Sequence, residues 1–123
     1  MALVTRAKTV LEIPTNPGVA WVCKWEGLDS DDDGEALEMP AWADRSVQVI
    51  GTFGAGGTIS FKGSNDGTNY EILQDIEGAA LTFTAAGLRS VLELTRYVKP
   101  VVTAGDGTTD LDVYLIVSGY RRW

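Results

Sequence analysis

Between residues 46 and 117, short runs of β-branched and aromatic residues alternate with turns rich in glycine, asparagine and aspartate. Runs this short are typical of strands, because helices are longer and tolerate interior glycine poorly. The runs 46–53 and 58–64 flank a glycine-rich turn, and we expect them to pair as a β-hairpin. Further strands are expected at 70–73, 80–84, 97–102 and 111–117. The pattern therefore predicts an all-β protein.

Three segments carry more specific expectations. Pro100 has no N–H to donate to a strand ladder, which places the run 97–102 near a sheet edge. The run 111–117 is the longest and most apolar, so we expect it at the centre of a sheet. Between residues 85 and 94, the spacing of Leu88, Val91 and Leu92 favours a short helical turn.

The size and composition of the chain predict one domain. It has 123 residues, 45% of them hydrophobic, which is enough for a single core without metals or disulfides. Two prolines interrupt regular structure before residue 19, and residues 1–18 are therefore expected to form an extended N-terminal arm. For residues 19–123 we predict a single jelly-roll-like antiparallel β-sandwich of about seven or eight short strands.

Acidic residues are concentrated in one segment. Residues 26–38 contain seven acids and no base, whereas the rest of the chain has ten of each. We therefore expect a solvated acidic loop at 27–39. The sequence at 29–34 also matches the opening of an EF-hand calcium loop, but Pro40 stands where the twelfth-position glutamate belongs. A weak Ca²⁺ site at Asp29, Asp31 and Asp33 is the alternative to a loop that binds no metal.

The composition argues against an enzyme. The chain has no histidine, which is the commonest general base and metal ligand. Its single cysteine, Cys23, lies in an apolar run and is expected to be buried. No Gly-Lys-Ser/Thr motif follows a glycine-rich loop, so a phosphate-binding loop is absent. We predict no catalytic residues and no cofactor.

Four tryptophans give the candidate contact residues. Trp21, Cys23 and Trp25 alternate with Val22 and Lys24 in the predicted strand 19–25, and both tryptophans are expected in the core. Trp42 and Trp123 are the candidates for a partner interface, with Arg121 and Arg122 as donors to carboxylates of that partner.

Charge and hydropathy indicate which partners to expect. The two terminal arginines are the only basic cluster, so we expect no binding of nucleic acid. There is no apolar stretch long enough for a membrane span and no signal peptide at the N-terminus. We therefore expect synthesis in a cytoplasm and no membrane association.

Residues 46–117 resemble the capsid decoration (cement) proteins of tailed bacteriophages. The resemblance is carried by Gly-Ser-Asn-Asp-Gly-Thr-Asn-Tyr at 63–70, by 80–87, by Arg-Tyr-Val-Lys-Pro at 96–100 and by Gly-Asp-Gly-Thr-Thr at 105–109. It implies a non-enzymatic virion protein, made in the bacterial host, that binds the outside of the capsid and clamps neighbouring major capsid subunits. The implied partners are the major capsid protein and further copies of the chain, as a homo-oligomer with a trimer favoured over a dimer.

The same hairpin region is also similar to discoidin-type, galactose-binding-like β-sandwiches. That similarity implies an alternative function, a carbohydrate-binding module in which an exposed aromatic residue such as Tyr70 or Trp42 stacks on a sugar. A tail or neck protein of the same virion is a further alternative. Both resemblances imply a jelly-roll-like sandwich, in agreement with the predicted strands.

Overall fold

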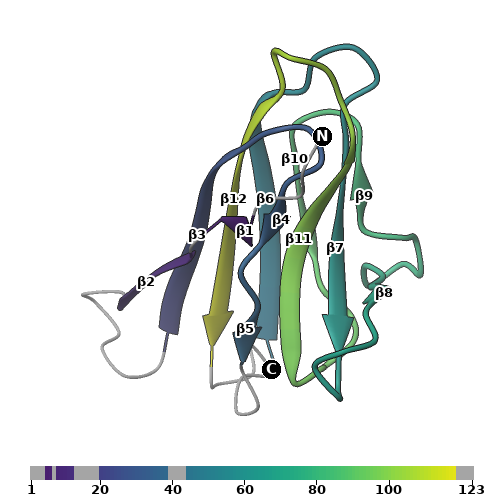
Figure 1. Cartoon of the computed structure of the whole chain (residues 1–123). Coiled ribbons are helices and arrows are strands. Elements are labelled where there is room, and N and C mark those ends of the chain that lie inside the picture. Colours follow the sequence, from purple (N-terminus) through teal and green to yellow (C-terminus); the bar gives the residue numbers. More distant parts are fainter. Residues whose placement is uncertain (1–4, 7, 13–19, 39–43, 119–123) are drawn as a thin grey trace.

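The computed structural model describes residues 5–6, 8–12, 20–38 and 44–118, which form two β-sheets packed face to face and no helix (Figure 1). The strands are β1 (Thr5–Arg6), β2 (Lys8–Glu12), β3 (Ala20–Leu28), β4 (Asp33–Gly34), β5 (Leu37–Glu38), β6 (Asp44–Thr52), β7 (Thr58–Ser64), β8 (Glu71–Ile72), β9 (Thr82–Phe83), β10 (Gly87–Ser90), β11 (Tyr97–Ala104) and β12 (Asp110–Ser118).

The seven-stranded sheet has the order β1-β4-β11-β7-β8, with β5 paired to β11 and β9 paired to β7. The five-stranded sheet has the order β10-β6-β12-β3-β2. Within the described residues, all strand pairs are antiparallel except the short pair β1–β4. In the described part, seven strands have four or more residues and the others have two, so the prediction of a sandwich of seven or eight strands is confirmed.

The core lies between the sheets and follows the two-residue period of the strands. On β12, Leu111, Val113, Leu115 and Val117 are buried, and the residues between them face outward. β12 pairs with β6 on one side and β3 on the other, as its apolar sequence predicted. Trp25 crosses the core and meets Phe61 of the opposite sheet edge-to-face, with ring centroids 6.3 Å apart. The predicted burial of Trp25 and Cys23 is confirmed, and Trp21 packs partly buried against the same core.

The predicted hairpin of residues 46–53 and 58–64 is wrong, because β6 and β7 belong to different sheets. The turn between them carries the chain from one sheet to the other at the end where β11 joins β12 (Figure 1). Two hydrogen bonds tie these turns together: Ala55 N–H donates to Asp106 over 2.9 Å, and the Thr109 hydroxyl donates to the Phe53 carbonyl over 2.8 Å. The alternation of apolar residues and the turn residues identified both segments as strands, but they did not show which strands pair with each of them.

The predicted edge position of the run 97–102 is also wrong. β11 lies inside the seven-stranded sheet, with β7 on one side and β4 and β5 on the other. Pro100 is tolerated there because its nitrogen faces the break between β4 and β5, where no ladder bond is lost. Gly34 lies against the proline ring at this break.

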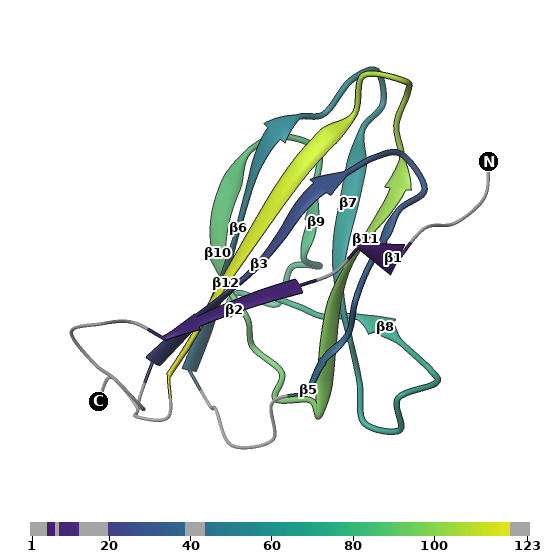
Figure 2. The same cartoon turned by 60° about the vertical axis from the view of Figure 1, so that its left-hand side comes forward.

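Two further expectations are corrected. The segment around Leu88 is not a helical turn, because β10 pairs with β6 along four residues. The N-terminal segment is not simply an arm, because β1 pairs with β4, and β2 lies beside β3 at one edge of the five-stranded sheet (Figure 2). The sandwich therefore includes residues 5–6 and 8–12, and the rest of residues 1–18 lies outside the described part.

Candidate interaction face

The outer faces of the two sheets differ in chemistry. The face of the seven-stranded sheet is charged: Lys99 and Lys62 lie opposite each other on β11 and β7, and Lys99 Nζ forms an ion pair with Asp33 over 2.8 Å. Arg96 and Glu38 form another ion pair on this side, with 2.6 Å between Nε and Oε2. The centre of the outer face of the five-stranded sheet is instead lined by uncharged side chains.

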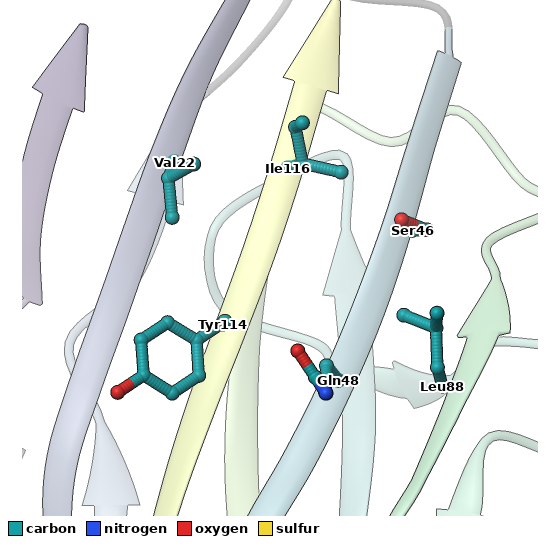
Figure 3. A pocket seen from close by; sticks show the side chains of 6 residues that line it. All are labelled: Val22, Ser46, Gln48, Leu88, Tyr114 and Ile116. Carbon is teal, nitrogen blue, oxygen red and sulfur yellow. The ribbon is translucent and has the colours of Figure 1, made fainter. Parts of the chain in front are cut away.

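Six side chains from four strands line a shallow hollow of about 390 Å³ on the five-stranded sheet (Figure 3). We call them the uncharged face: Val22 of β3, Ser46 and Gln48 of β6, Leu88 of β10, and Tyr114 and Ile116 of β12. None of these residue types carries a charge at neutral pH. The hollow lies on the open outer face of a regular sheet and is not an enclosed ligand pocket.

The strand register explains why these side chains share one face. Directly paired residues of neighbouring strands point to the same side of a sheet. One row runs across β10, β6 and β12 as Leu88, Gln48 and Tyr114. The next runs across β6, β12 and β3 as Ser46, Ile116 and Val22. Their neighbours along the strands point inward into the core, so the core fixes the positions of the outer residues.

The uncharged face is exposed although it is partly apolar. Leu88 is 64% exposed and Ile116 is 41% exposed, and both stand out from the sheet. Charged side chains adjoin this face on β3 and β12: Lys24 is the direct strand partner of Tyr114 and forms a pair with Glu26 over 3.8 Å. Asp112 accepts a hydrogen bond from Gly27 N–H. An apolar centre with charges at its rim is the usual composition of a protein–protein interface.

Arg89 holds the edge strand β10 in place behind Leu88. Its side chain points inward, where Nε and Nη2 donate to Asp75 Oδ2 over 3.0 and 2.7 Å. The guanidinium also donates to the carbonyls of Ala80 and Thr82 and lies over the ring of Phe83. These hydrogen bonds from Arg89, followed by one from Ala79 N–H, lower the pKa of Asp75 below its usual value. β10 is thus fixed to the loop before β9 as well as to β6.

The acidic segment is not the solvated loop that its charge predicts. It contains β4 and β5, and Asp32 is 3% exposed. Asp33 pairs with Lys99 across the sheet, and Asp32 accepts a hydrogen bond from Asp29 N–H over 2.8 Å. The segment folds onto the sandwich because β11 supplies both backbone partners and a lysine.

The calcium candidates do not come together as a metal site. Asp31 takes a left-handed backbone conformation with φ of 68°, which turns the chain between Asp29 and Asp33. Among the described residues, which include all three aspartates, no three acidic or sulfur ligands are grouped as a metal ion requires. Asp33 instead uses one carboxylate oxygen for Lys99.

The remaining candidate residues are only partly described. Trp42, Arg121, Arg122 and Trp123, predicted at a partner interface, all lie outside the described residues. Tyr70, named for the carbohydrate alternative, already has the ammonium of Lys99 4.4 Å from the centre of its ring. That cation occupies a face on which a sugar would have to stack.

Sequence reasoning missed the uncharged face. The signal was present in β12, where Tyr114 and Ile116 occupy the outward positions of a strand whose inward positions are also apolar. Apolar residues on both faces of a strand are typical of a strand that is covered on both faces.

Comparisons with known proteins give the fold. No family model matches the chain. No curated protein sequence matches it. The structure is similar to the crystal structure of the SPBc2 prophage-derived protein YomS, with a TM-score of 0.59 and 13% sequence identity, over 80% of this chain and 94% of YomS. Within the described residues there is no helix that could cross a lipid bilayer.

Proposed function

We propose that the protein is a non-enzymatic structural component of a bacteriophage virion that binds the outer surface of the capsid and joins neighbouring major capsid subunits. The observation that carries the proposal is the fold, which the protein shares over most of its length with a prophage-derived protein. The sequence resemblance to capsid decoration proteins over residues 46–117 supports the same assignment.

The structure offers what such a role needs. A protein that stabilises a shell must be rigid and must present surfaces to other proteins, and it needs no reaction centre. Here the two sheets share one continuous core, and one outer face is uncharged. Each contact with the shell can be weak, because many copies on a regular lattice act together. The net charge of −7 disfavours binding to DNA, so the capsid exterior is a suitable location.

Binding to isolated phage heads tests this function. The full chain is mixed with heads of the phage that encodes it, prepared without their decoration, and the mixture is separated on a density gradient and viewed by negative-stain electron microscopy. The proposal predicts saturable binding at regular positions of the shell. Purified tails from the same phage serve as the control particles. Binding to tails alone, or to neither particle, would overturn the capsid assignment.

A further inference from the structure

We propose that Asp66 is a latent site of isoaspartate formation, and that Ser64 protects it by binding both of the groups that would react. The inference concerns the chemical lifetime of the chain, so it does not depend on the capsid assignment. Isomerisation of an aspartate inserts its β-carbon into the backbone, which would change the shape of the turn that contains it.

The reaction needs only the chain and water. The backbone nitrogen of the residue after an aspartate attacks the side-chain Cγ, a C–N bond forms, the nitrogen loses its proton, and one carboxyl oxygen leaves as water. A second water molecule then opens the five-membered succinimide ring, and opening at the backbone carbonyl gives isoaspartate. A glycine after the aspartate favours the attack, because it has no side chain to hinder the nitrogen.

The chain has three Asp-Gly pairs, at 33–34, 66–67 and 106–107. The carboxylate of Asp33 pairs with Lys99 of β11, and the carboxylate of Asp106 accepts from Ala55 N–H of another turn. The pair 66–67 lies in the turn between β7 and β8, where residues 65–69 are all exposed to water. The hydrogen bonds to its carboxylate come from residues 64–69 themselves, so local contacts must prevent the reaction there.

Ser64 is hydrogen-bonded to both reacting groups. Gly67 N–H donates to the Ser64 hydroxyl oxygen over 2.9 Å, and this hydroxyl donates to Asp66 Oδ1 over 2.8 Å. Ser64 is 4% exposed at the end of β7, where it pairs with Tyr97 of β11. The attacking nitrogen must therefore leave a side chain that the sheet holds in place.

The other contacts keep the carboxylate of Asp66 in its unreactive form. Oδ1 also accepts from the N–H groups of Thr68 and Asn69 over 2.8 Å each, and Oδ2 accepts from the Asn69 side-chain amide over 2.7 Å. The bond from Asn69 N–H, followed by that from Thr68 N–H, lowers the pKa of Asp66 below its usual value. The protonated form, from which water can leave, is therefore rarer than in an ordinary aspartate.

Incubation of the full chain at neutral pH, folded in buffer and unfolded in urea, tests the protection. Trypsin places the three Asp-Gly pairs in separate peptides, 25–45, 63–89 and 97–121. Liquid chromatography with electron-transfer fragmentation then measures isoaspartate in each peptide. We expect isoaspartate at Asp66 to form at least about tenfold more slowly in the folded chain, because the turn must open before it reacts. Equal rates in the folded and unfolded chains would overturn the proposal.

Ser64→Ala tests the role of the hydroxyl. The variant loses two hydrogen bonds, so we expect isoaspartate at Asp66 to form about tenfold faster than in the parent protein. The rates at the other two Asp-Gly pairs should not change. Ser60→Ala is the matched control, because Ser60 is also buried in β7 but its hydroxyl bonds to Thr82.

Three results would overturn the assignment to Ser64. Equal rates at Asp66 in the Ser64→Ala and Ser60→Ala variants would show that the hydroxyl gives no protection. An equal rise at all three Asp-Gly pairs would show that the substitution acts through general unfolding. A slower reaction in Ser64→Ala would show that the hydroxyl carries a proton from Gly67 to Asp66 and promotes the reaction.

Discussion

Gly34→Ala tests whether the acidic segment is built into the sandwich. A β-carbon at this position would lie 2.6 Å from Cδ and 2.7 Å from Cγ of Pro100, and 2.9 Å from Cδ1 of Trp25. These contacts are about 1 Å shorter than normal carbon–carbon contacts. The proline ring is rigid and Trp25 is fully buried, so neither can move without disturbing the core. Overpacking of this kind costs about 1–3 kcal/mol, and we expect the free energy of unfolding to fall by that amount.

Urea denaturation followed by tryptophan fluorescence measures this effect. Gly107→Ala is the matched control, because nothing lies within 4 Å of its β-carbon position, and we expect little change in stability. In a Pro100→Ala background the ring is gone, and the cost of Gly34→Ala should become smaller, since the two sites are in contact. A Gly34→Ala protein as stable as the Gly107→Ala protein would show that the segment does not pack on β11 as described.

Three further changes probe the charged groups. Arg45 is 2% exposed, and its guanidinium nitrogens have no hydrogen-bond acceptor among the described residues. Burial lowers the pKa of Arg45 to about 10, so the energetic cost of the buried charge is fully present at pH 7. Arg45→Met should therefore raise the free energy of unfolding, measured by urea denaturation, by about 1–3 kcal/mol. A loss of stability would refute this prediction. Asp33→Asn removes the charge that pairs with Lys99 over 2.8 Å and should cost about 2 kcal/mol, which thermal melting would show. The Thr108 hydroxyl and then Ala55 N–H lower the pKa of Asp106 from 3.8 to about 2, so its stabilising effect is complete above about pH 5 and is largely lost as the pH falls to about 2. Urea midpoints between pH 7 and pH 2 should therefore depend less on pH in Asp106→Asn than in the parent protein, and equal dependence would contradict this assignment.

The sequence predicts the fold class well because the relevant signals are local. Alternation of apolar residues identifies β12 and places Trp25 and Cys23 in the core. The strands that pair with a given strand can lie far away in the sequence, which explains the error at β6 and β7. Both segments are strands, but each pairs with strands of a different sheet. Pro100 shows the same limit, because only the break between β4 and β5 makes it acceptable inside a sheet.

The candidate site could be predicted only in part. The acid count of residues 26–38 suggested a solvated loop, but Asp33 meets Lys99 from a strand far along the chain. The uncharged face depends on the register of four strands, which no single segment contains. The outward residues of β12 were the accessible clue, because Tyr114 and Ile116 make that strand apolar on both sides.

The central claim, that the protein is part of a virion and lies on the capsid surface, is tested most directly by immunogold electron microscopy. Antibodies raised against the purified chain are applied to intact particles of the phage that encodes it. The account predicts gold particles distributed over the head and absent from the tail. Label confined to the tail, or intact virions that carry no label although the antibody recognises the native protein, would contradict it.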